Sequence, residues 1–365
     1  AESIGSNDRG ANLFFLTDDL NDANTYATLS GGDTTGIYFL EGAGFKEFVA
    51  KVNPIDFDEL VDSITLYKPR PLEGRLWEKY VKRHVPAEPK LSTAVPEVER
   101  ILSKTRGVLL YIEQIRMIID SVSGLKEDEA LMVENSLKSQ APNDLAASRL
   151  LFLKGAIGNG RSEEEATRIF DSLMQGIRFT HSKAQSIQQA YLSYRTAYLK
   201  THHFMEYFAA LLNGNIDVPE KMKEYLEYIE GNGVNVLPSD VNKSFLSFVV
   251  EDGSIRRPLL AKVEYFDELR LFLEERSSRG AFESFEDFLA RCRSLISKEA
   301  VSAMIDAGVF ATFGMSEEQM RIALETTYRS EVGRGAPQMQ KAGKTKEKNR
   351  VDGGDQQLSL FEDEE

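Results

Sequence analysis

Cysteine is almost absent from this chain: its 365 residues include only Cys292, which has no partner for an internal disulfide. Such sparing use of cysteine is typical of a reducing compartment, and we expect the cytoplasm. No run of about 18 apolar residues occurs, so the sequence predicts no membrane-spanning helix. Residues 1–6 lack both the charged and apolar regions of a signal peptide and a starting methionine. We therefore expect a trimmed chain or part of a longer protein.

Positive charge is also in short supply. The chain has 44 lysines and arginines against 58 aspartates and glutamates, a net charge of −14. This balance argues against a protein that binds nucleic acid over its whole surface, because such proteins are normally basic. It is compatible with a local basic face, since the field of DNA extends over roughly 8–10 Å. The composition, 42% hydrophobic and 28% charged, is that of a globular protein, and the length predicts about two or three domains.

Apolar residues recur mostly at intervals of three and four, which predicts a mainly α fold. Asp22, with Asp18 and Asp19, can cap a helix that ends near Leu29, and the Ser162 hydroxyl can cap another. Further helices are expected at 97–102, 109–122, 128–137, 163–179 and 182–212, the last with a stripe that includes Tyr191, Tyr194 and Tyr198. We expect this stripe to be core rather than a surface on which bases stack.

The composition changes near residue 225, where we place a domain boundary. Residues 226–332 are expected to form a small helical domain with a short strand at 234–238 and half of a hairpin at 247–250. Its short helices are expected at 266–275, 285–291, 298–307 and 317–325. Residues 333–365 are rich in Gly, Lys, Gln, Glu and Asp, with few apolar side chains, and we expect a disordered tail.

Six short motifs follow one another along the chain: DTTGIYFLE at 33–41, LYKPRPL at 66–72, GVLLYIEQ at 107–114, SYRTAYLK at 193–200, LPSDVN at 237–242 and QLSLF at 357–361. In this order and spacing they resemble the alpha subunit of bacterial DNA polymerase III, a C-family replicative polymerase. The resemblance implies a multi-helix fingers domain at 1–225, a degenerate helix-hairpin-helix and clamp-binding domain at 226–332, and a tail at 333–365 that carries the sliding-clamp motif.

The resemblance implies that the closing motif binds the sliding clamp through Gln357, Leu358, Leu360 and Phe361. The three apolar residues of this set are the only large apolar side chains after Val351. Burying Leu360 and Phe361 in a partner's pocket would contribute about 1.5–3 kcal/mol each, before the cost of ordering the tail. Gln357 would set the register through its amide. The alternative is a polar tail that happens to contain leucines.

Contacts with nucleotide and DNA are implied at Lys68, Arg70, Lys138 and Lys183, and they are expected to be weak. The family's Arg-Pro-Gly-Pro-Leu turn is KPRPL here, and its cationic helix, which faces the triphosphate, reads ENSLKSQ at 134–140. Lys138 is the one cation left in that stretch, and Glu134 would repel a triphosphate. The alternative for 134–140 is a solvated helix end. Lys183 stands at the family's lysine within HSKAQ at 181–185.

The family's second domain binds DNA through the glycines of a hairpin, which reads AKVEY at 261–265 here. Both glycines are gone, so we expect poor DNA binding, with one nonspecific contact at Lys262. We predict no catalytic residue and no metal site: the family's metal-binding carboxylates belong to the palm, which should lie before residue 1. Mg²⁺ is expected only with a palm. His181, His202 and His203 have no cysteine or carboxylate cluster at metal-binding spacing.

Three functional hypotheses stay open. The chain is the fingers and clamp-binding part of a DNA-directed DNA polymerase, with the sliding clamp, primed DNA, dNTP and other replisome or repair proteins as partners. It is a non-catalytic pseudo-polymerase scaffold at the clamp. Or it is a general helical interaction protein with no role at DNA. The chain alone is expected to be inactive in each case, because the catalytic carboxylates are absent from it.

Overall fold

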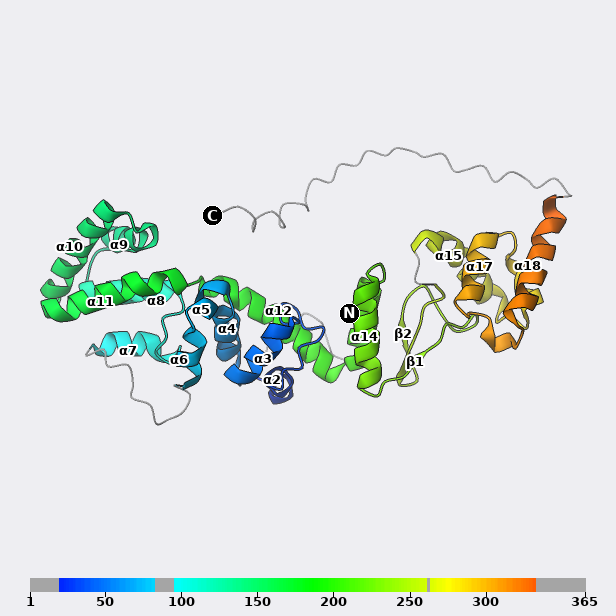
Figure 1. Ribbon diagram of the computed structural model, residues 1–365, viewed down its shortest axis with the longest axis horizontal. Coiled ribbons are helices and arrows are strands. Elements are labelled where there is room, and N and C mark those ends of the chain that lie inside the picture. Colours follow the sequence, from blue (N-terminus) through cyan, green and yellow to red (C-terminus); the bar gives the residue numbers. More distant parts are fainter. Residues whose placement is uncertain (1–19, 83–94, 261–262, 333–365) are drawn as a thin grey trace.

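The structure, a computed structural model, describes residues 20–82, 95–260 and 263–332. It is mainly α, as predicted, with one small sheet. Figure 1 shows an elongated arrangement: α8–α11 lie at one end, α15–α18 at the other, and α12 runs between the first group and the middle. The predicted disorder of residues 333–365 falls outside the described residues. Within those residues, no helix combines the length and hydropathy needed to cross a bilayer.

A first core surrounds α12 (Lys183–His202), whose Tyr194 is fully buried. The predicted cap of the first helix is confirmed: the Asp22 carboxylate accepts the backbone N–H of Thr25 at 2.7 Å. Asp18 and Asp19 lie outside the described residues. Five short helices pack here: α2 (Ala23–Ser30), α3 (Ala43–Val52), α4 (Phe57–Leu66), α5 (Pro69–Glu73) and α6 (Leu76–Lys82). The last four were not predicted from the sequence.

A second core unites five helices: α7 (Pro96–Ser103), α8 (Ile112–Ser123), α9 (Glu127–Ser139), α10 (Pro142–Gly158) and α11 (Glu163–Gly176). The predicted cap of α11 is confirmed as a capping box: the Ser162 hydroxyl accepts Glu165 N–H at 3.2 Å, and the Glu165 carboxylate accepts Ser162 N–H at 3.1 Å. The helix expected at 163–179 ends at Gly176 and tightens into the 3-10 turn η1 (Ile177–Phe179). Sequence patterns missed α10, in which Leu150 is 70% exposed.

The single helix expected at 182–212 is wrong, because the chain breaks at His203 into α12 and α13 (Phe204–Gly214). His203 has φ −136° and ψ 51°, outside the helical region. The break turns Phe204 and Phe208 toward Tyr228 of α14 (Pro219–Gly231), with ring centroids 6.1 and 5.1 Å from that ring. The expectation that the tyrosine stripe is core holds for Tyr194, which is fully buried.

The DTTGIYFLE motif at 33–41 docks on α12 and α14. The Lys200 ammonium donates to the Asp33 carbonyl and carboxylate oxygens, both at 2.8 Å, and to the Thr35 carbonyl at 2.9 Å. The Tyr228 hydroxyl donates to the same carboxylate at 2.6 Å, and the Ser193 hydroxyl donates to the Tyr38 carbonyl at 2.9 Å. Two of the six motifs are therefore joined to each other, and their polar residues hold the fold.

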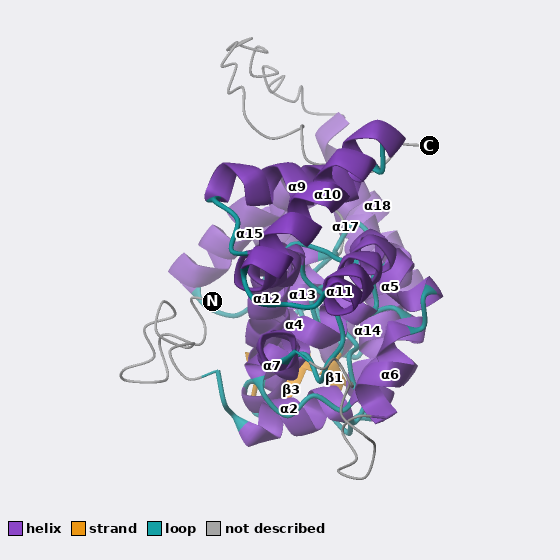
Figure 2. Ribbon diagram, turned by 90° about the vertical axis from the view of Figure 1, so that its left-hand side faces the viewer, coloured by secondary structure: helices purple, strands orange, loops and turns teal. Residues whose placement is uncertain are grey.

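The second part of the chain contains a three-stranded sheet of β1 (Val236–Leu237), β2 (Val249–Glu251) and β3 (Ser254–Arg256) in the order β1-β3-β2. The predicted hairpin is confirmed: β2 pairs antiparallel with β3 across Asp252 and Gly253, whose φ values are 47° and 76°. Positive φ at both turn residues matches the right-handed twist of the strands. Figure 2 shows how little strand there is among the helices.

An aromatic core closes this part of the chain, with Phe272, Phe285, Phe288 and Phe310 fully buried. It is enclosed by α15 (Phe266–Arg279), α16 (Phe285–Cys292), α17 (Lys298–Asp306) and α18 (Glu317–Val332), with short turns η2 (Val263–Tyr265) and η3 (Ala311–Phe313).

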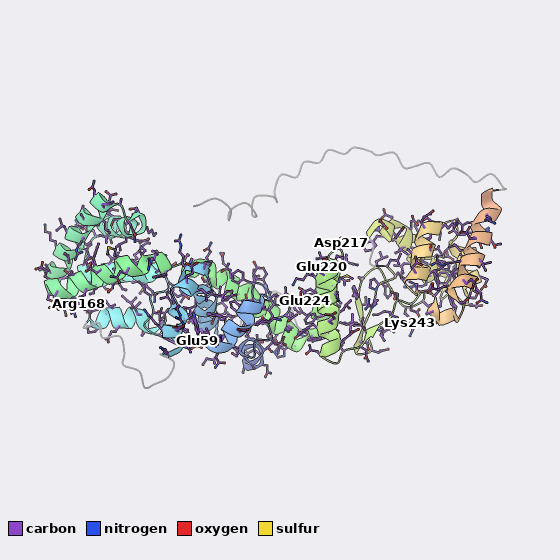
Figure 3. The ribbon with its side chains drawn as sticks, in the orientation of Figure 1. Glu59, Arg168, Asp217, Glu220, Glu224 and Lys243 are labelled. Carbon is purple, nitrogen blue, oxygen red and sulfur yellow. The ribbon has the colours of Figure 1, made fainter. Side chains whose placement is uncertain are left out.

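Helix α14 runs through residue 225, so the boundary placed there stays a prediction. Figure 3 shows Asp217, Glu220 and Glu224 close together at α14, between the two ends of the molecule.

Candidate functional site

The GVLLYIEQ motif at 107–114 is tied by its backbone to the start of α12. His181 N–H donates to the Leu110 carbonyl at 3.0 Å, and Ile112 N–H donates to the His181 carbonyl at 3.1 Å. Glu113 then caps α12, because its carboxylate accepts the backbone N–H of Lys183 at 3.0 Å. A carboxylate is favoured there by the positive end of the helix dipole. The motif thus fixes where α12 begins.

The buried side chain of Gln114 fixes the backbone of the same motif by hydrogen bonds. Its side-chain oxygen accepts the backbone N–H groups of Leu110 and Tyr111 at 2.9 and 3.0 Å, and its amide nitrogen donates to the Thr105 hydroxyl at 2.8 Å. Both polar atoms of this buried amide are therefore engaged. Glu113 and Gln114, which the sequence pattern singled out, have structural roles here.

The KPRPL turn approaches α12 from the other side. Pro69 begins the short helix α5, where its missing N–H costs nothing, and Lys68 precedes it as the N-cap residue. The Lys68 ammonium donates to the Ser186 hydroxyl of α12 at 3.2 Å, and burial lowers the pKa of Lys68. Arg70, one residue beyond Pro69, is exposed.

An open cavity of about 590 Å³ lies where these segments meet the end of α9. Arg70 lines it from α5, Lys138 from α9, and Arg178 and His181 from the segment that leads into α12. Within the part of the chain that the structure describes, no ion pair engages Arg70 or Arg178. The Arg178 guanidinium lies over the Phe179 ring, 4.5 Å from its centroid. Such a set of cations from separate segments is suited to an anion such as phosphate.

His181 contributes a neutral group to this cavity. Burial, together with the charges of Lys68 and Arg70, lowers the pKa of His181 to about 4. Its Nε2 atom is enclosed and has no hydrogen-bond partner among the described residues. A neutral imidazole in this place is a hydrogen-bonding group for a ligand and adds no positive charge.

Glu134 departs from the solvated helix end that is one expectation for residues 134–140. It is only 1% exposed, and its carboxylate accepts Lys138 Nζ and Arg116 Nε, each at 2.7 Å. Burial acts to raise the pKa of Glu134, but these two partners outweigh it and lower the pKa. Lys138 reaches Glu134 because residues four apart share one helix face. Asn135 and residues 138–140 are exposed, as that interpretation expected.

Lys183 lies beside the cavity without lining it. Its ammonium is 3.3 Å from the Asp58 carboxylate and 5.5 Å from the centroid of the Tyr111 ring. The structure therefore brings Arg70 and Lys138 together, holds Lys68 against Ser186 of α12, and turns Lys183 toward α4. Lys262 and the four clamp-motif residues Gln357, Leu358, Leu360 and Phe361 lie outside the described residues.

Metal-binding groups do not gather in the described ranges. His202 Nε2 contacts the Asp22 carboxylate at 2.9 Å, and no set of three or more His, Cys, Asp or Glu side chains there is close enough to hold an ion. Sequence reasoning missed Arg178, because it sits in a stretch expected to be ordinary helix, next to the apolar Ile177 and Phe179.

Comparison with known proteins identifies the family. A profile described as the bacterial DNA polymerase III alpha subunit finger domain matches residues 3–160, and a helix-hairpin-helix motif profile matches residues 233–320. DNA polymerase III subunit alpha from Thermus aquaticus is 32% identical to this chain over 347 residues, or 91% of the chain. The chain belongs to the bacterial DNA polymerase III alpha-subunit family.

Other members of the polymerase III alpha family match over similar spans. The Aquifex aeolicus subunit is 31% identical over 82% of the chain, and a Helicobacter pylori subunit is 26% identical over 85%. The chain spans only 28%, 26% and 26% of the lengths of the Thermus, Aquifex and Helicobacter relatives. The cavity is built partly by α5 and α9, both within the finger-domain match, and partly by the segment at 177–182 that follows it.

Proposed function

We propose that this chain acts in DNA replication or repair as the fingers, helix-hairpin-helix and clamp-binding region of a polymerase III alpha protein. Its cavity contacts phosphate groups of primed DNA and, weakly, of dNTP. The observation that carries this proposal is the convergence of Arg70, Lys138 and Arg178 on one cavity from segments far apart in the sequence. Guanidinium groups pair with phosphate oxygens through two parallel hydrogen bonds, and arginine is therefore suited to this task.

Removing either cavity arginine should weaken binding of primed DNA. We expect Arg70→Ala and Arg178→Ala each to raise the Kd about tenfold, because each loses a hydrogen bond to a charged group. The dependence of log Kd on log salt should also become shallower by roughly one counterion. Fluorescence anisotropy of a labelled primer-template, titrated with the full chain at several salt concentrations, measures both quantities.

Arg100→Ala is the matched control. Arg100 is exposed on α7, and its loss removes the same charge without touching the cavity. If all three variants weaken DNA binding equally, only overall charge matters and the cavity is not the contact. If none of them does, the phosphate-binding role is wrong.

Clamp binding is a second part of the proposal and has its own test. We expect Leu360→Ala and Phe361→Ala each to weaken capture of the chain by immobilised sliding clamp at least tenfold, because each removes about 1.5–3 kcal/mol of apolar burial. Asp363→Ala, in the same tail, should leave capture unchanged. Retention that is absent for every form, wild type included, would favour the plain helical interaction protein.

One observation favours a non-catalytic scaffold as the second candidate. The cation of α9 that reaches the cavity, Lys138, is already engaged by Glu134, which weakens the case for a grip on triphosphate. Binding of dNTP in the presence of primed template, sensitive to Lys183→Ala, would support a working polymerase. Its absence, with clamp binding intact, would support the scaffold. Catalysis itself belongs to this proposal only if the parent protein has a palm with its metal-binding carboxylates.

A further inference from the structure

Lys138 lines the cavity, but its charge is not available to a ligand in full. Its Nζ lies 2.7 Å from Glu134 Oε1, and the other oxygen of that carboxylate holds Arg116 at 2.7 Å. Glu134 is 1% exposed and Lys138 is 49% exposed, so water reaches this ion pair only at Lys138. A second anion approaching Lys138 has to compete with a buried carboxylate that has fixed geometry.

The charge that faces the cavity is therefore small. Arg70 and Arg178 are exposed, and no ion pair engages either of them within the described ranges. His181 is neutral near pH 7, since burial and the charges of Lys68 and Arg70 lower its pKa. Two guanidinium groups suit a single phosphate group, which each can grip through parallel hydrogen bonds. A triphosphate carries several more negative charges, and the third cation that lines the cavity, Lys138, is already paired with Glu134.

We propose that Glu134 is a specificity-determining residue of this cavity: by holding Lys138, it restricts the cavity to a single phosphate group and disfavours a triphosphate. The ligand class is a phosphodiester of a nucleic-acid strand or free phosphate, which share this chemistry. The inference rests on the proposed phosphate-binding function of the cavity and names the anion that the cavity accepts.

The variant Glu134→Gln tests this because it removes the charge and keeps the volume. The side chains of Arg116 and Lys138 are 57% and 49% exposed, so neither is left as a buried, unpaired charge. The glutamine oxygen can still accept one of the two hydrogen bonds. Lys138 is then released toward the cavity. Far-ultraviolet circular dichroism during urea unfolding checks that the helices of the variant, α9 included, are folded.

Isothermal titration calorimetry on the full chain, at matched ionic strength near neutral pH, compares inorganic phosphate, sodium tripolyphosphate and a short single-stranded oligonucleotide without terminal phosphates. Wild type should bind tripolyphosphate no more tightly than phosphate. Glu134→Gln should bind tripolyphosphate about tenfold more tightly than wild type does, the gain of roughly one charge-assisted contact, with phosphate affinity within about twofold. Glu134→Gln with Lys138→Met should lose that gain. If the oligonucleotide binds and inorganic phosphate does not, the phosphate group in the cavity belongs to a nucleic-acid strand. If inorganic phosphate binds and the oligonucleotide does not, the ligand is free phosphate.

Two results overturn the inference while the proposed function stands: wild type binds tripolyphosphate tightly and Glu134→Gln changes nothing, or the gain persists after Lys138→Met, which would assign it to Arg116. If wild type and Glu134→Gln bind none of the three anions, the cavity is not a phosphate site, and the proposed function fails there along with the inference.

Discussion

Replacing Lys200 by methionine should lower the free energy of unfolding by about 2–4 kcal/mol, because three oxygens lose their donor at once. The Lys200 side chain is 2% exposed and donates to the Asp33 carbonyl and carboxylate oxygens and to the Thr35 carbonyl at 2.8–2.9 Å. Its ammonium also lies 4.7 Å from the centroid of the Tyr228 ring. Burial lowers the pKa of Lys200, while Asp33 acts in the opposite direction. The residue joins two motifs that are far apart in the sequence.

Urea unfolding followed by Trp77 fluorescence measures this loss. Trp77 is the chain's single tryptophan, and it packs against the same core as Tyr194 and Ala197 of α12. Lys223→Met is the control, since the Lys223 side chain is 77% exposed on α14 and its removal should change the unfolding free energy by less than about 0.5 kcal/mol. Equal midpoints for Lys200→Met and Lys223→Met would show that Lys200 does not hold the motif.

Asp62→Asn should remove a dependence of stability on pH between about pH 4 and pH 6. Asp62 is 3% exposed, and the hydroxyls of Tyr80 and Tyr111 both donate to its carboxylate. Burial raises the pKa of Asp62 from 3.8 to about 6, although both tyrosines and the charge of Lys183 act to lower it. The folded state therefore binds more protons than the unfolded state in this window, and stability falls as pH rises through it.

The size of this effect follows from the two pKa values. The two pKa values, 3.8 in the unfolded state and about 6 in the folded state, correspond to about 3 kcal/mol in total, at about 1.36 kcal/mol for each unit of pKa difference. Between pH 4 and pH 7, wild type should lose about 2.4 kcal/mol of this relative to Asp62→Asn. Urea titrations at intervals across this range, read by Trp77, give the difference directly. Asp267→Asn serves as the control, because it removes the same charge from α15, outside the core that Trp77 reports. Parallel profiles for wild type and Asp62→Asn would contradict the prediction.

Sequence patterns predicted correctly those features that depend only on residues close together in the chain. The caps at Asp22 and Ser162 and the hairpin turn at Asp252 and Gly253 are decided within a few residues, and each is confirmed. The helix expected across His203 failed, because its apolar spacing continues while the packing of Phe204 and Phe208 on α14 bends the chain. Helices α3–α6 were not predicted, and their buried residues share one core with α12.

The candidate site was also predicted only in part from the sequence. The family resemblance singled out Lys68, Arg70, Lys138, Lys183 and Lys262, and the structure brings Arg70 and Lys138 to one cavity. The sequence could not show that Arg178 joins them or that Lys183 turns to Asp58 instead. Which cations face a ligand depends on how α5, α9 and the start of α12 are placed relative to one another.

The order and spacing of its motifs indicated the family, and the spacing of its apolar residues indicated a mainly helical fold, since both are carried by residue types at set intervals along the backbone. Tertiary structure alone decided the charge of the cavity. Glu134 reads as a repulsive surface charge in the sequence, yet it is buried between Arg116 and Lys138 and cancels the cation that the motif offers. The interaction energy of two charges depends on their distance and burial, and neither quantity can be read from the sequence.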